Sequence, residues 1–241
     1  MSIYNSLSNK VVLVTGGSKG IGLSIANFFL KNKAKVFVTG TKKYSEKFKG
    51  LEYIQCDFLN TDEFDSFLSI INKLKIDILI NNAGINKIGQ FDKINSDDFM
   101  NIHKVNTFSP FKICQSVLPN MQTNKWGRII NIASIFGKIS KEYRASYSAS
   151  KFGLDGITAS LAAEVAKDGI LVNTVSPGFI KTELTKNILG IKGMKLMSSK
   201  VPIQRLGEPE EVARLVLWLC SDQNSYISGQ NIVIDGGFIR V

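Results

Sequence analysis

Short apolar runs alternate with stretches of helical periodicity along the whole chain. Seven apolar runs are typical of buried strands, at residues 10–15, 35–39, 51–56, 76–80, 128–133, 170–175 and 231–234. Helical patterns lie between them, among others at residues 23–30, 62–74, 96–121 and 208–221. Such alternation is typical of βαβ units, in which crossover helices join parallel strands. The pattern therefore predicts an α/β fold with a parallel sheet.

Two segments depart from this alternation. The crossover from Gly40 to Gly50 is short for a helix, which predicts a trimmed sheet edge. Residues 181–200 carry five lysines and one acid and show little periodicity, so we expect helical fragments at most. Long loops in compact domains are usually lids or binding segments. We therefore predict a single domain over residues 1–241 with a substrate lid at about 181–204.

Ser134, Tyr147 and Lys151 are the first candidates for chemistry. Tyr147 and Lys151 are four residues apart, so a helix places them on one face. An ammonium beside a phenol lowers the phenol pKa, which allows acid–base work near neutral pH. Ser134 follows an apolar run, where it can hydrogen-bond a substrate oxygen. Taken alone, these three residues fit equally well with a surface pair beside an unrelated serine.

A glycine-rich turn follows the first apolar run and opens the first helix. Its residues are Gly16, Gly17, Ser18, Lys19, Gly20, Ile21 and Gly22. Glycine at a strand-to-helix turn lets backbone amides approach a pyrophosphate at the helix N-terminus. The spacing is G-x-x-x-G-x-G rather than G-x-G-x-x-G. The turn indicates a dinucleotide site.

The second apolar run ends without an acid. Sites specific for NAD usually place a carboxylate there to bind the ribose 2′-hydroxyl. This chain instead has Gly40, Thr41, Lys42 and Lys43, with Lys19 nearby in the glycine-rich turn. Cations suit a 2′-phosphate, so we predict NADP(H) in preference to NAD(H). A lysine-rich loop tip is the alternative.

Other strand ends carry small and polar residues that are expected to line the same crevice. Asp57, with Phe58 beside it, suits an adenine contact or a turn cap. The remaining candidates are Asn81, Asn82, Ala83 and Gly84 after the fourth run and Pro177 and Gly178 after the sixth. Asn106 lies in mid-helix, where asparagine is unfavourable, which indicates a local task. His103, the only histidine, is expected to be a polar helix-face residue, so we predict no metal site.

Composition narrows the class of protein further. The chain has 241 residues, 44% hydrophobic and 21% charged, as expected for a globular domain. Its net charge of +10 is spread along the chain, which favours a solvated surface over a nucleic-acid site. We find no apolar run long enough to span a membrane and no export signal. Cys56, Cys114 and Cys220 are widely separated, so we expect free thiols in a reducing cytoplasm.

Together these motifs resemble the short-chain dehydrogenase/reductase family. The match covers essentially the whole chain and extends to a terminal Asp235-Gly236-Gly237. It implies a Rossmann-type doubly wound domain with a seven-stranded parallel sheet. Within the family, the chain is most similar to the 3-oxoacyl-[acyl-carrier-protein] reductase group. Members are typically dimers or tetramers, joined through the two long helices and the C-terminal helix and strand, so a homotetramer is expected.

The resemblance also implies residue roles. Tyr147 is expected to be the proton donor or acceptor, Ser134 the residue that orients the substrate carbonyl, and Lys151 the contact to the nicotinamide ribose. Asn106 is expected to position a proton-relaying water. Ile180 and Thr182 are expected to contact the nicotinamide carboxamide. The expected activity is an NADP(H)-dependent interconversion of a ketone and a secondary alcohol.

The substrate is less constrained by the sequence. Carrier-protein reductases commonly grip the acidic carrier with two arginines; Arg128 matches the first, but the second falls at Asp168. Lys138 and Arg144 lie between Ser134 and Tyr147, where the Arg144 guanidinium suits a bidentate contact to a carboxylate or phosphate. Cations of a solvated loop are an equally good interpretation. Three possibilities remain open: a 3-oxoacyl thioester, an anionic carbohydrate or nucleotide sugar, and a cofactor-sensing protein without turnover.

Overall fold

The computed structural model describes residues 5–43 and 48–240. Its seven strands form one parallel sheet in the order β3-β2-β1-β4-β5-β6-β7. The strands are β1 Val11–Val14, β2 Lys35–Gly40, β3 Glu52–Gln55, β4 Ile78–Asn81, β5 Gly127–Ile132, β6 Ile170–Pro177 and β7 Asn231–Ile234. The predicted α/β fold with a seven-stranded parallel sheet is confirmed.

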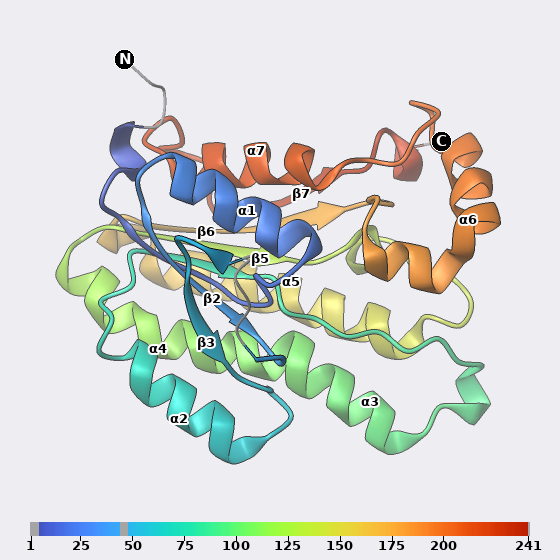
Figure 1. The fold of residues 1–241 in the computed structure, drawn as a ribbon, viewed down its shortest axis with the longest axis horizontal. Coiled ribbons are helices and arrows are strands. Elements are labelled where there is room, and N and C mark those ends of the chain that lie inside the picture. Colours follow the sequence, from blue (N-terminus) through green and yellow to red (C-terminus); the bar gives the residue numbers. More distant parts are fainter. Residues whose placement is uncertain (1–4, 44–47, 241) are drawn as a thin grey trace.

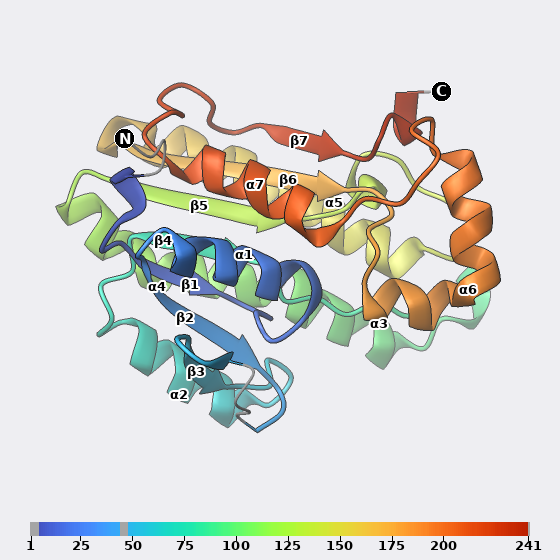
Figure 2. The same ribbon diagram turned by 45° about the horizontal axis from the view of Figure 1, so that its top comes forward.

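Helices cover both faces of the sheet (Figures 1 and 2). They are α1 Gly20–Lys31, α2 Thr61–Ile71, α3 Ser96–His103, α4 Ser109–Thr123, α5 Ala145–Val165, α6 Glu183–Lys200 and α7 Pro209–Cys220. Helices α1 and α7 lie together on one face, while α2, α4 and α5 lie on the other. No helix in the described ranges is long and apolar enough to cross a membrane.

Alternation along the strands divides the core into two layers. In β1, Val12 and Val14 pack under α1 and α7, whereas Leu13 between them packs under the opposite helices. Ile78 and Leu79 of β4 divide in the same way. Successive strand side chains point to opposite faces, so strands buried on both sides are continuously apolar. This burial on both faces explains the uninterrupted apolar runs of the sequence.

Local capping fixes several helix starts. The Asn60 side chain accepts hydrogen bonds from the backbone amides of Asp62 and Glu63, and α2 begins there. Asn95 caps α3 in the same manner. Pro209 occupies the first turn of α7, behind a capping box between Glu208 and Glu211. Each cap satisfies amides that the first helical turn leaves without partners.

Two sequence expectations need correction. The helix predicted over residues 96–121 is interrupted by a π-helical turn at Lys104–Phe108, between α3 and α4. Residues 181–200 are predicted to hold helical fragments at most, yet residues 183–200 form α6, with a break at Gly190, where φ is 66°. Glycine tolerates this left-handed backbone, so the two halves of α6 meet at an angle. The trimmed edge predicted between Gly40 and Gly50 falls partly on residues 44–47, outside the described part.

Candidate active site

A cleft of about 400 Å³ opens at the carboxyl ends of the strands. The chain order reverses between β1 and β4, and in open parallel sheets such a switch point is where ligands bind. The cleft is bounded by the glycine-rich turn, the ends of β2, β4, β5 and β6, and the first turn of α6. It is lined by these residues predicted from the sequence: Gly16, Ser18, Lys19, Gly20, Ile21, Gly40, Thr41, Asp57, Phe58, Asn82, Ala83, Gly84, Ser134, Tyr147, Lys151, Pro177, Gly178, Ile180 and Thr182.

The glycine-rich turn lies against the end of β4. Gly16 has φ 62°, and a Cβ atom there would lie 2.8 Å from Ala83 Cα. A Cβ on Gly22 would collide with the Asn82 side chain, so this glycine permits close packing behind the cleft wall. Asn82 Nδ2 donates to the carbonyls of Thr15 and Gly16, at 2.9 and 3.1 Å. The backbone there is fixed and free of side chains, as a bound dinucleotide requires.

The end of β2 forms the other side of this dinucleotide subsite. Gly40 leaves no room for a side chain, because an added Cβ would lie 2.7 Å from Tyr53 Oη and 2.9 Å from Ser18 Oγ. The Tyr53 hydroxyl donates a hydrogen bond to the carbonyl of Lys42, which fixes the backbone after β2. Thr41 and Lys19 line the cleft, whereas Lys42 is exposed outside its wall. Among the described residues directly after β2, up to Lys43, there is no acid.

Ser134, Tyr147 and Lys151 all line the cleft, the serine just after β5 and the other two in the first two turns of α5. Ser134 caps a short 3₁₀ turn, and its Oγ accepts a hydrogen bond from the Phe136 amide at 3.2 Å. Burial raises the pKa of Tyr147, while a hydrogen bond with Ser134 and the charge of Arg144 act in the opposite direction. The Lys151 Nζ atom lies 5.7 Å from the centroid of the Tyr147 ring. The structure thus brings the hydroxyl of Ser134 into the same cleft as the phenol of Tyr147 and the ammonium of Lys151.

Asn106 lies in the π-helical turn and is fully buried. Its Oδ1 accepts from the Ile85 amide and its Nδ2 donates to the Ile85 carbonyl, both at 2.9 Å. Nδ2 also donates to Ser150 Oγ at 3.0 Å. Asn106 therefore clamps the segment after β4 to α5. The local task expected for an asparagine in mid-helix is this bidentate backbone contact.

A model of the family described as enoyl-(acyl carrier protein) reductase matches residues 16–239. The 3-oxoacyl-[acyl-carrier-protein] reductase of Buchnera aphidicola is 40% identical, with 96% of this chain and 98% of that protein covered. The reductase of the same name from Rickettsia bellii is 38% identical over 98% of this chain and 99% of its own length. The chain belongs to the short-chain dehydrogenase/reductase family. It is an oxidoreductase that interconverts a ketone and a secondary alcohol.

Solved structures of this family superpose closely on the chain. The aldohexose dehydrogenase of Thermoplasma acidophilum has a TM-score of 0.91 and 30% identity, covering 99% of this chain and 97% of that one. A candidate NAD(P)-dependent gluconate 5-dehydrogenase of Beutenbergia cavernae, with bound NADP, has a TM-score of 0.91 and 26% identity. The coverage there is 98% of this chain and 99% of that chain. Use of a nicotinamide dinucleotide is therefore supported for this short-chain dehydrogenase/reductase.

The two cations predicted to bind substrate do not line the cleft of this reductase. Lys138 Nζ instead lies 3.7 Å from Asp155 Oδ2. The Arg144 guanidinium lies over the Phe136 ring, with its Cζ 5.3 Å from the centroid. His103 also does not line the cleft, and its ring lies against Phe99 at a tilt of 33°, with the centroids 4.5 Å apart.

Arg128, which was matched to a carrier-gripping arginine, is buried in the interior. Its Nη1 donates to the carbonyls of Gly127 and Gly169, and its Nη2 donates to that of Asn224. At 6% exposure it has no surface to offer an acidic partner. Asp168, the second matched position, forms an ion pair with Lys125 at 2.5 Å. The departure noted from the sequence at Asp168 thus extends to Arg128, whose guanidinium is engaged by backbone carbonyls.

Several cleft residues were not singled out from the sequence. They are Thr39, Cys56, Leu59, Ile85, Asn86, Val105, Ile132, Ala133, Glu183, Leu184 and Thr185. Most are apolar or backbone-lining positions that lack a spacing signal. Cys56 is buried, and burial, followed by the charges of Glu63 and Asp57, raises its pKa to about 12. The thiol is therefore un-ionised at neutral pH.

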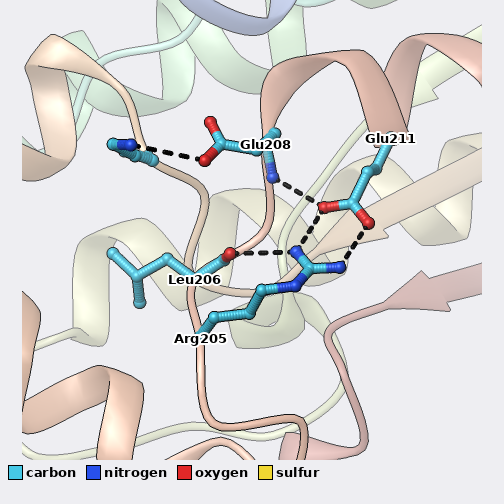
Figure 3. Close-up of polar contacts among 5 residues, drawn as sticks. Arg205, Leu206, Glu208 and Glu211 are labelled. Carbon is cyan, nitrogen blue, oxygen red and sulfur yellow. Dashed lines mark hydrogen bonds and ion pairs between the residues drawn. The ribbon is translucent and has the colours of Figure 1, made fainter.

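Contacts between residues 180–181 and 205–211 hold together the two ends of the segment that contains α6. Ile180 and Gly207 form a β-bridge, with Lys181 N donating to Gly207 O at 2.8 Å. Arg205 forms a bidentate ion pair with Glu211, at 2.7 and 2.8 Å, beside the capping box of α7 (Figure 3). Both ends of residues 181–206 are thereby held together, and the first turn of α6 stands at the cleft wall.

Proposed function

We propose that this protein is an NADP(H)-dependent 3-oxoacyl thioester reductase. The observation that carries the proposal is the placement of Ser134, Tyr147 and Lys151 in one cleft that also contains a glycine-rich turn. Relatives named 3-oxoacyl-[acyl-carrier-protein] reductase, at 35–40% identity over nearly the full length, support the substrate class. A sensor without turnover has no need of the intact set of acid–base residues.

The proposed roles follow from these contacts. The Tyr147 hydroxyl gives its proton to the carbonyl oxygen during reduction, and its phenolate recovers the proton in the reverse direction. The Ser134 hydroxyl donates a hydrogen bond to the same oxygen as negative charge develops there. Lys151 holds the cofactor ribose and favours the phenolate. When bound, the nicotinamide supplies or accepts the hydride.

The preference for NADP(H) rests on the end of β2. A 2′-phosphate at this position meets Lys19 on the wall, Lys42 at the rim and no carboxylate on the strand end. The ribose of NAD(H) finds no acidic partner among the described residues there. Charge-assisted hydrogen bonds to phosphate are the stronger kind, so the phosphorylated cofactor should bind better.

A carbohydrate substrate is the second candidate. Arg128 is buried and Asp168 is paired with Lys125, so neither position presents a free cation to an acidic carrier. Structural neighbours that superpose at TM-scores of 0.91 include an aldohexose dehydrogenase and a candidate gluconate 5-dehydrogenase. A sugar acid or nucleotide sugar with a reducible carbonyl therefore deserves the same assay.

We also propose a homo-oligomer joined through the long helices. Large apolar side chains are exposed on α3, α4 and α5 and on the π-helical turn between the first two. They are Met100, Phe108, Phe111 and Phe152, with exposures from 41 to 63%. Light scattering after size exclusion tests this assembly, and a monomeric mass contradicts it.

Reduction assays discriminate between the two substrate classes. NADPH oxidation is followed by absorbance with an acetoacetyl thioester, with NADH in parallel and Tyr147→Phe as the blank. Turnover that the variant abolishes supports the thioester reading. If no thioester is reduced although calorimetry shows that NADPH binds, a panel of keto sugar acids and nucleotide sugars is assayed next. A thioester-inactive protein that reduces such a sugar overturns the first proposal.

A further inference from the structure

Arg144 is a half-buried cation that has no carboxylate partner in the described ranges. It is the residue before α5, and Tyr147 follows three residues later in the first turn. A positive charge at a helix N-terminus is unfavourable, because the terminal amides already carry partial positive charge. We therefore expect a negative group to offset the charge of Arg144 at this position.

The acids near Arg144 are already engaged with lysines. Glu142 pairs with Lys141 at 3.5 Å, and Asp155 pairs with Lys138 at 3.7 Å. Glu183, an exposed acid of the opposite cleft wall, belongs to α6. The other cation beside the tyrosine is Lys151, whose Nζ donates a hydrogen bond to the Ile132 carbonyl. Arg144 thus forms no ion pair with a described acid, although the charge of Glu142, two residues away, acts on it.

The guanidinium is held at the corner where Ser134 and Tyr147 meet. Its Cζ lies 5.3 Å from the centroid of Phe136, and the amide of Phe136 donates to Ser134 Oγ. One residue therefore supports both the serine and the arginine. Because Arg144 does not line the cleft, its charge reaches the reaction through Tyr147 rather than by touching substrate.

We propose that Arg144 is a positioning residue whose charge stabilises the phenolate form of Tyr147. The mutual attraction of Arg144 and Tyr147 lowers the tyrosine pKa against the larger effect of burial. The aromatic face of Phe136 holds the guanidinium in place by a cation–π contact. Removing this charge makes the phenolate harder to form.

The test follows Tyr147 directly, by NMR titration of protein labelled with [ζ-¹³C]tyrosine, with Tyr147→Phe assigning the signal. Arg144→Gln should shift the titration upward by about half to one pH unit, and Arg144→Lys should restore most of the difference. Lys73→Gln, at an exposed position beyond α2, removes the same charge and should leave the signal unchanged. Circular dichroism over the same pH range confirms that each variant is folded.

This inference rests on the acid–base role proposed for Tyr147, but the titration needs neither substrate nor turnover. An unchanged Tyr147 titration in Arg144→Gln overturns it, whatever the enzyme assay shows. If turnover is found, the acid-side limb of the kcat profile for alcohol oxidation, where Tyr147 acts as the base, should move in the same direction as the NMR signal. A rise in KM confined to anionic substrates, with no shift in titration, instead assigns Arg144 to substrate binding.

Discussion

The Nζ atom of Lys151 donates a hydrogen bond to the carbonyl oxygen of Ile132, 2.9 Å away. Ile132 is the last residue of β5, two positions before Ser134. The bond links the second turn of α5 to the end of β5. Lys151 and Ser134 are therefore held at the same edge of the sheet. Burial of the ammonium also lowers the pKa of Lys151 from 10.5 to about 8.

This depressed pKa predicts how stability depends on pH. Below pH 8 the lysine is charged in both the folded and unfolded states, so the full cost of burying the charge is present. As pH rises from 8 to 10.5, the folded state loses its proton first and this cost is relieved. Wild type should therefore gain about 2 kcal/mol of unfolding free energy relative to Lys151→Met between pH 7 and pH 10. Urea denaturation without cofactor measures the difference; a pH-independent difference contradicts the prediction.

Removal of the phenol hydroxyl should abolish proton transfer and leave the cleft intact. We expect Tyr147→Phe to lower kcat by about 10³-fold or more, since positioned acid–base groups contribute on the order of 10²–10⁴-fold. Ser134→Ala should lower kcat by about 10²-fold. Steady-state kinetics together with dinucleotide affinity provide the measurement. A variant that loses cofactor binding in proportion to kcat indicates a damaged fold instead.

Arg128→Met should destabilise the protein without weakening recognition of a carrier. Three backbone carbonyls lose a charged donor, which we expect to cost about 3 kcal/mol of unfolding free energy. Lys125→Ala is the control, because it removes a largely exposed ammonium from its ion pair with the mostly buried Asp168 and should cost only about 1 kcal/mol. The ratio of KM for carrier-bound and free thioester should be unchanged in both variants. A selective loss of carrier affinity in Arg128→Met argues for a direct contact.

Cofactor preference should depend on the two lysines at the end of β2 and in the glycine-rich turn. We expect Lys19→Ala and Lys42→Ala each to weaken NADPH binding by about tenfold, because each removes a cation near the proposed 2′-phosphate position. Affinity for NADH should change little. Calorimetric titration measures the affinity of each variant for both dinucleotides. If affinity for NADPH and for NADH falls equally, the lysines bind the pyrophosphate that both dinucleotides share, which contradicts the prediction.

The base of the α6 segment should loosen in acid. Hydrogen bonds from Arg205, followed by the Glu208 amide, lower the pKa of Glu211 from 4.5 to about 2. Its contribution to stability is therefore complete above pH 4.5 and is lost as pH falls toward 2. The pair is partly exposed, so we expect a local rather than a global effect. Hydrogen exchange in residues 201–207 should be faster in Glu211→Gln at neutral pH, and wild type should approach the variant at pH 3.

The sequence alone determined which segments of the chain line the cleft. Apolar runs of four to eight residues can be satisfied by strands buried on both faces, and glycines at a strand-to-helix turn have few other uses. The four-residue interval between Tyr147 and Lys151 fixes a shared helix face. Each of these signals is local, so the predicted lining of the cleft agrees closely with the structure. The exceptions are Gly22, packed behind the wall, Lys42, outside it, and three residues that do not line the cleft: Asn106, Lys138 and Arg144.

Only the tertiary structure decided which charges face the cleft and which are buried. Arg128 follows an ordinary strand pattern, yet carbonyls from positions 169 and 224 surround its guanidinium. Lys138 is paired with Asp155, while Arg144 remains without an acid partner in the described ranges. Asn106 meets Ile85, 21 residues away, through a π-helical turn. Burial and pairing depend on contacts between distant segments, and no local spacing records them.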